Sequence, residues 1–224
     1  MKLLLQAVAA SVFGLVYFGV LLFLPTGTFN YWQAWVFIAV FTATTAGPSV
    51  YWAVKRPEIL RRRMNAGPLA EARPAQKIIV TGVYLLASAT FVVSALDHRF
   101  GWSQVPTTVV LIGDVLVAGG LGLAMLVVHQ NSYAAATITV EAEQQLVSTG
   151  LYGLVRHPMY FGALIMMIGT PVALDSYWGL VVLIPSLVVL AFRILDEEKV
   201  LTQELSGYVE YTQKVHHRLV PGVW

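Results

Sequence analysis

The stretch Gly150-Leu151-Tyr152-Gly153-Leu154-Val155-Arg156-His157-Pro158-Met159-Tyr160-Phe161-Gly162 decides how the rest of the chain is interpreted. Proline suits the first position of a helix, because its missing N–H would have no partner there. The residue before a proline avoids the α region, so the residues ahead of Pro158 are predicted to lie on an extended loop. The apolar run that follows predicts a membrane helix with an arginine, a histidine and two tyrosines at its mouth.

The composition of the whole chain agrees with a membrane location. Of its 224 residues, 57% are apolar and 12% are charged, whereas soluble domains average about 45–50% apolar and about 25% charged. We therefore expect an all-α, polytopic integral membrane protein. The net charge of +2 is too small to indicate a nucleic-acid partner. The absence of cysteine excludes disulfides, iron–sulfur clusters, thiolate zinc sites and a cysteine nucleophile, and we expect no metal.

Six apolar segments are each close to the roughly 17–25 residues that a membrane helix needs. They run about Leu3–Leu24, Tyr31–Val54, Ile78–Leu96, Thr107–Val128, Pro158–Leu174 and Tyr177–Leu195. The chain divides into residues 1–128, with four membrane helices and a basic loop at 55–77, and residues 129–224. The second part holds a polar loop, a helical hairpin turned at Asp175-Ser176, and an amphipathic tail.

The distribution of positive charge predicts the orientation. Of the 14 Lys and Arg residues, all except Arg99 fall on one side of a six-span arrangement. Because cytoplasmic loops are enriched in Lys and Arg, that side is predicted to be the cytoplasm, with both termini there. The compactness of the chain favours the inner membrane of a prokaryote.

Three further features bear on how the helices are placed. Tryptophans near the predicted span ends indicate an interfacial belt; they are Trp32, Trp35, Trp52, Trp102 and Trp178. Glycines in the fourth span predict a face for close helix contact; they are Gly113, Gly119, Gly120 and Gly122. Asp114, near the outer side of the same span, is expected to make a packing hydrogen bond or to pair with His98 or Arg99.

The hairpin is expected to bring polar residues from distant parts of the chain together. Arg156 and His157 begin its first helix, and Arg193 and Glu197 end its second. Arginine suits a carboxylate or phosphate, glutamate suits ribose hydroxyls, and tyrosine rings suit adenine or a cation. An ordinary ion pair between Arg193 and Glu197, four residues apart, is an open alternative. The chain has no phosphate-binding GxxxxGK[ST] or dinucleotide GxGxxG, and no HExxH or GxSxG.

The order of these residues resembles a known signature. Its parts are Leu146-Val147-Ser148-Thr149-Gly150-Leu151-Tyr152, Arg156-His157-Pro158-Met159-Tyr160-Phe161-Gly162, Arg193 with Glu197-Glu198, Gly207-Tyr208-Val209-Glu210-Tyr211 and Arg218-Leu219-Val220-Pro221. Together they resemble the isoprenylcysteine carboxyl methyltransferase and phospholipid methyltransferase superfamily of integral membrane methyltransferases, over about residues 119–224.

The resemblance implies a cofactor, a class of substrate and a set of site residues. S-adenosylmethionine is the implied cofactor, and a lipid-like or prenylated substrate is implied to enter from the bilayer. Residues 129–224 would then form the catalytic core. The implied cofactor contacts are Gln145, Leu146, Val147, Tyr152, His157, Pro158, Met159, Tyr160 and Glu197. The implied catalytic residues are Arg193, which orients the substrate, and His157.

The chemistry of methyl transfer favours a carboxylate as acceptor. A carboxylate is ionised at neutral pH and needs no general base, so Arg193 would act as an electrostatic clamp. Holding the acceptor, the methyl group and the sulfur in line can lower the barrier by roughly 7–11 kcal/mol at best. An amine or hydroxyl acceptor would have to lose a proton, for which His157 or Glu198 would be the candidates.

Two other functions remain open from the sequence. Membrane sterol or enone reductases that use NADPH have a similar C-terminal hairpin, and the Arg61–Arg63 run would suit a 2′-phosphate. A non-enzymatic transporter or lipid-binding scaffold would be expected to carry ionisable residues near the bilayer midplane, whereas most of those in this chain gather at the inner interface.

Overall fold

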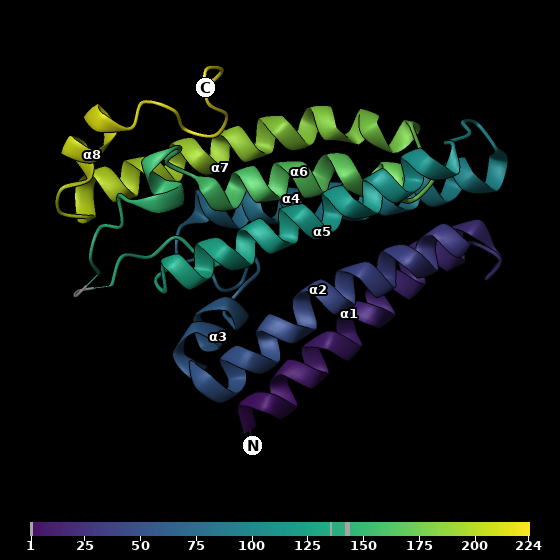
Figure 1. The fold of residues 1–224 in the computed structure, drawn as a ribbon, viewed down its shortest axis with the longest axis horizontal. Helices are drawn as coiled ribbons and strands as arrows, with labels where there is room; N and C mark the ends of the chain where they lie inside the picture. The colour runs from purple at the N-terminus through teal and green to yellow at the C-terminus, as the bar shows by residue number, and fades with distance from the viewer. Residues whose placement is uncertain (1, 135, 142–143) are drawn as a thin grey trace.

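The computed structural model describes residues 2–134, 136–141 and 144–224. All the regular structure in these residues is helical (Figure 1). The α-helices are α1 (Lys2–Thr26), α2 (Trp32–Lys55), α3 (Pro57–Met64), α4 (Pro74–Phe100), α5 (Thr107–Gln130), α6 (Pro158–Ala173), α7 (Leu183–Glu204) and α8 (Tyr208–Lys214). Two 3₁₀ turns, η1 (Gly150–Gly153) and η2 (Trp178–Val182), precede α6 and α7.

The prediction of a polytopic helical membrane bundle is confirmed. Within the described residues, five helical segments are long and apolar enough to cross a membrane: α1, α2, α4, α5 and the continuous run of η2 and α7. The sixth predicted segment, α6, has 16 residues. It is therefore about 24 Å long, shorter than the roughly 30 Å hydrocarbon core.

The basic loop contains a helix that the sequence analysis did not predict. α3 has Pro57 at its first position, Glu58 in its first turn and three arginines in its last turn. These are ordinary helix start and stop signals, since each charge complements the helix dipole at its end. Ile59 and Leu60 of α3 are buried, so the helix is held against the bundle by its apolar face.

Close packing between α5 and α6 uses two of the four predicted glycines. A Cβ on Gly120 would overlap the carbonyl oxygen of Gly162, and a Cβ on Gly113 would overlap the backbone of Ala173. Gly119 and Gly122 have nothing within 4 Å of such a Cβ, so the prediction was wrong for these two. Since seven residues make about two helical turns, Gly113 and Gly120 share one face.

At the end of the bundle opposite α3 and α8, the turn between α6 and α7 (Figure 1) contains Asp175. Its carboxylate accepts hydrogen bonds from Gln33 Nε2 at 3.1 Å and from the backbone N–H of Val105 at 3.0 Å. His98 Nδ1 lies 3.1 Å from the same group. The expected pairing of Asp114 with His98 is therefore wrong, because His98 contacts Asp175 instead.

Two other placements differ from the sequence analysis. Arg99, the alternative partner proposed for Asp114, donates to the carbonyl oxygen of Pro25 instead, and neither carboxylate oxygen of Asp114 has a hydrogen-bond partner among the described residues. Trp52 is 4% exposed and packs with Ile59 and Leu60. It is a core residue between α2 and α3, and only the other four tryptophans of the predicted belt are exposed.

Candidate active site

The start of α6 is formed as the sequence predicts. Pro158 occupies the first helical position, and His157 before it has φ −124° and ψ 62°, outside the α region. The C-terminal tail fastens this junction, because the N–H groups of Arg156 and His157 donate to the carbonyl oxygens of His217 and Arg218 at 2.9 Å. These two hydrogen bonds join the residues before α6 to the C-terminal tail.

Glu198 is the electrostatic centre of the junction. Its carboxylate lies 2.9 Å from Arg156 Nε, 3.2 Å from His157 Nε2 and 2.8 Å from Arg218 Nε. One glutamate on α7 thus holds together the loop, the start of α6 and the tail. A carboxylate so fully engaged is poorly placed to accept a proton from a substrate.

Tyr160 connects the two charged residues of α7 that line the site. Its hydroxyl donates to Glu197 Oε2 at 2.5 Å and accepts from Arg193 Nε at 3.2 Å. No direct ion pair joins Arg193 and Glu197 among the described residues; the carboxylate that pairs with Arg193 is Glu71, at 2.7 Å. The alternative of a simple i,i+4 pair is therefore wrong.

Arg193 is held by four protein acceptors. Besides Tyr160 and Glu71, its guanidinium donates to the side-chain oxygen of Gln76 and to the carbonyl oxygen of Ala136. An arginine has five N–H donors, so the described residues use all but one. Glu71 and Gln76 lie in or near the basic loop, which the sequence analysis treated as a determinant of topology.

A single cavity at this end of the bundle contains every residue that the sequence analysis assigned to the site. Its volume is about 110 Å³, and the cavity is partly open to solvent. The predicted residues that line it are Gln145, Leu146, Val147, Tyr152, His157, Pro158, Met159, Tyr160, Arg193 and Glu197. The loop before α6, the hairpin and the polar end of α7 therefore meet as predicted.

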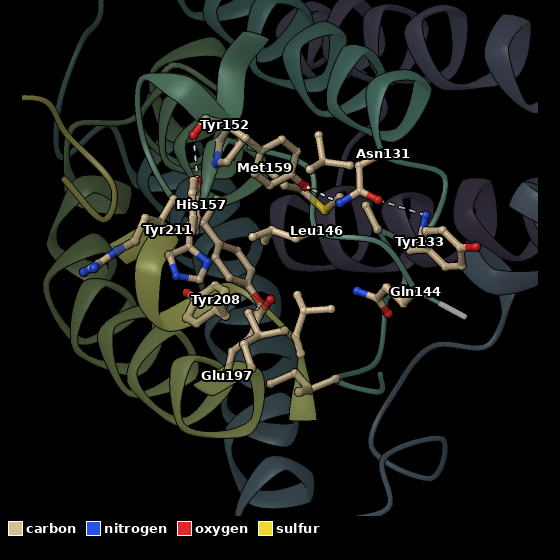
Figure 2. Close-up of a pocket in the computed structure, with 18 of the residues that line it drawn as sticks. Asn131, Tyr133, Gln144, Leu146, Tyr152, His157, Met159, Glu197, Tyr208 and Tyr211 are labelled. Carbon is tan, nitrogen blue, oxygen red and sulfur yellow. Dashed lines mark hydrogen bonds between the residues drawn. The ribbon is translucent and has the colours of Figure 1, made fainter. Parts of the chain in front are cut away.

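The cavity also has walls to which the sequence analysis gave no role (Figure 2). They include Asn131, Tyr133, Gln144, Tyr208 and Tyr211. Of these, only Tyr208 and Tyr211 belong to the signature recognised in the sequence. What brings them here is tertiary structure, since α8 folds back over the loop and the Tyr211 hydroxyl donates to the carbonyl oxygen of Tyr152 at 2.7 Å.

The aromatic wall of the cavity is uncharged. Burial raises the pKa of Tyr152 to about 12, and burial also raises the pKa values of Tyr208 and Tyr211. These phenols therefore stay protonated at neutral pH, and Tyr152 accepts a hydrogen bond from Asn131 Nδ2 at 3.1 Å. Neutral tyrosine rings beside the Glu197 carboxylate suit a ligand that has both an aromatic base and a positive charge.

The described residues contain no group of three or more His, Cys, Asp or Glu side chains that could hold a metal ion. The polar groups that line the cavity are hydroxyls, amides, the Glu197 carboxylate, the His157 imidazole and the guanidinium groups of Arg156 and Arg193. This set fits a nucleoside with a sulfonium group, and the expectation that the protein uses no metal stays a prediction.

Comparison with known proteins points to the same segments. Residues 108–207, from α5 to the end of α7, match the phospholipid methyltransferase family model. A probable protein-S-isoprenylcysteine O-methyltransferase of Oryza sativa subsp. indica is 30% identical over 193 residues, or 84% of this chain and 95% of the rice protein.

Two further relatives match over shorter stretches. The protein-S-isoprenylcysteine O-methyltransferase of Saccharomyces cerevisiae is 32% identical over 123 residues, or 52% of this chain and 51% of the yeast protein. The Delta(14)-sterol reductase of Mus musculus is 35% identical over 95 residues, which is 39% of this chain but only 22% of the mouse protein.

Proposed function

The chain belongs to the isoprenylcysteine O-methyltransferase family of membrane methyltransferases, and from this premise we propose that it methylates a lipid-like carboxylate with S-adenosylmethionine at the cytoplasmic membrane face. The observation that carries the proposal is the cavity, which gathers all ten residues assigned from the sequence. Its position at the polar end of the bundle supports a water-soluble cofactor and an acceptor from the bilayer.

The side chains of the cavity match the parts of the cofactor. Glu197, oriented by Tyr160, would accept hydrogen bonds from ribose hydroxyls, and the tyrosine rings would cover the adenine or the sulfonium charge. Leu146 and Val147 supply apolar surface. Arg193 holds Tyr160 in place, and its remaining N–H is available to orient the substrate.

The balance of the reaction supports a carboxylate acceptor. When bound, S-adenosylmethionine supplies a methyl group on a positively charged sulfur; an acceptor carboxylate oxygen forms the new O–C bond as the C–S bond breaks, and the electron pair stays on sulfur. No proton is transferred, so no general base is required. This agrees with the contacts of Glu198, whose carboxylate is already engaged by two arginines and a histidine.

Calorimetry on the purified protein in detergent tests the cofactor. We expect saturable binding of S-adenosylmethionine and of S-adenosylhomocysteine, and no binding of NADPH. Glu197→Ala should lower the affinity for both ligands by tenfold or more. Glu204 is an exposed residue of the same helix, so Glu204→Ala should leave both affinities unchanged.

Binding of NADPH alone would overturn the proposal in favour of a reductase, the activity named for the mouse relative.

A second experiment identifies the methyl acceptor. Membrane lipid extracts, with a synthetic S-prenylcysteine offered alongside, are incubated with methyl-labelled S-adenosylmethionine. Base-labile label is expected, because a carboxyl methyl ester hydrolyses in mild alkali whereas an N-methyl group does not.

A further inference from the structure

Arg63 is a cation beside the cavity that no assigned role uses. It lies in the last turn of α3 and is partly buried. Its Nη1 is 3.3 Å from the sulfur of Met159, and Met159 is itself part of the cavity wall. A thioether is a weak acceptor, and it is the hydrogen-bond partner that the described residues give this guanidinium.

Other arginines with partly or fully buried side chains have a carboxylate. In the described residues, the N···O distances are 2.6 Å for Arg62 and Glu141, 2.8 Å for Arg73 and Asp196, 2.9 Å for Arg156 and Glu198, 2.7 Å for Arg193 and Glu71, and 2.8 Å for Arg218 and Glu198. Arg63 is the exception within the same residues. Since arginine is rarely buried unless it is paired, this exception makes Arg63 a candidate to bind an anion.

The surroundings of Arg63 would strengthen binding of such an anion. Ile59 and Leu60 of the same helix pack with Trp52, Val128 and Met159 in one apolar cluster. Burial lowers the pKa of Arg63, yet a guanidinium remains charged at neutral pH. In an apolar environment an opposite charge is attracted more strongly than in water.

Arg63 is better placed than Arg193 to take up the acceptor. Arg193 has one N–H left after its four hydrogen bonds to protein groups. Arg63 has its fork of donors almost entirely free among the described residues. Met159 packs against the cluster around Arg63 and also lines the cavity, so a group bound by Arg63 would lie next to the cofactor cavity.

We propose that Arg63 binds the carboxylate of an amphiphilic methyl acceptor, so that α3 and the start of α6 form the acceptor site beside the cofactor cavity. The inference rests on the proposed function. It also provides for release of the product, because methylation turns the carboxylate into a neutral ester and removes its attraction to the guanidinium.

Binding of acids and their neutral amides tests this assignment. The probes are dodecanoate and N-acetyl-S-farnesylcysteine, each with its carboxamide, titrated at pH 7.5 into protein saturated with S-adenosylhomocysteine. The wild type is expected to bind at least one acid tenfold or more tightly than its amide. Arg63→Gln should remove this preference and leave amide binding unchanged, and Arg63→Lys should restore part of it.

Arg61→Gln is the matched control, because Arg61 lies on the same helix and is exposed; it should keep the full preference for the acid. Unchanged affinity for S-adenosylhomocysteine in Arg63→Gln would verify that the variant is folded. The inference is overturned if Arg63→Gln retains the preference, or if the wild type shows none with either acid. Failure of the wild type to bind S-adenosylhomocysteine would instead refute the proposed function. In that case, binding of the acids and amides would be measured in the absence of S-adenosylhomocysteine.

Discussion

The Tyr160 hydroxyl forms hydrogen bonds with both Arg193 and Glu197, so its removal should loosen the positions of both side chains. Hydrogen bonds to charged groups contribute about 1.5–3 kcal/mol, and Tyr160 makes one to Glu197 and one with Arg193. Tyr160→Phe keeps the ring that stacks on His157. Because Glu197 would lose its fixed orientation, we expect the affinity for S-adenosylmethionine to fall by about tenfold, which corresponds to 1.4 kcal/mol.

Calorimetric titration with the cofactor measures this change. Tyr51→Phe, at an exposed position in α2, provides the control and should bind as the wild type does. An unaltered dissociation constant in Tyr160→Phe would mean that Glu197 does not contact the cofactor through the geometry seen here.

Individual residues differ in how far the sequence reveals their role. The positions of His157, Tyr160 and Glu197 in the cavity wall were predictable because these residues occupy fixed places in a recognisable signature, while their roles stay predictions. Glu71 was not, since it is an isolated acid in a basic loop and is 122 residues from the arginine it pairs with. Arg193 was assigned to substrate, and this assignment stays a prediction, although most of its donors serve the protein itself.

At the scale of helices, the contact between α5 and α6 positions the site, because α6 carries His157 and Tyr160 at its start. A Cβ on Gly120 would overlap Gly162 and would lie 2.7 Å from the backbone nitrogen of Met166. Gly120→Ala should therefore push the helices apart. Overpacking of this kind costs about 1–3 kcal/mol, and we expect the unfolding temperature in detergent to fall by several degrees at about 2–4 °C per kcal/mol.

Gly119→Ala gives a control one residue away on the same helix. A Cβ there meets nothing within 4 Å, so the thermal unfolding temperature should be unchanged or slightly raised. Equal losses in the two variants would argue against the close contact. The sequence predicted a small-residue face in this span but did not distinguish these glycines, since which face meets α6 depends on packing rather than on composition.

α3 illustrates the opposite case, in which local signals were present and the helix was missed. The arginines of its last turn were interpreted as determinants of topology or as a site for a 2′-phosphate, and not as a helix end. Hydrophobic length therefore predicted the membrane helices well, whereas the short helix α3 was hidden by its charge.

For the whole molecule, the loop, the hairpin and the tail form one site because the membrane helices bring their polar ends to one side. Three turns meet around Asp175 at one end. α3 and α8 lie at the other end (Figure 1), and residues of α8 line the cavity. This separation agrees with the bias of positive charge in the sequence. What the sequence could not supply was the fold of α8 over the cavity, which depends on contacts such as that of Tyr211 with Tyr152.

The orientation in the membrane is open to a direct test, because the chain has no cysteine of its own and any introduced thiol is labelled alone. Gln104 lies in the exposed loop between α4 and α5, whereas Leu69 and Val223, 96% and 80% exposed, lie in the loop between α3 and α4 and in the C-terminal tail. Since positive charge is retained in the cytoplasm, a membrane-impermeant maleimide should label Gln104→Cys in intact cells. Leu69→Cys and Val223→Cys should react only after permeabilisation, and the reverse pattern would place the cavity outside the cytoplasm.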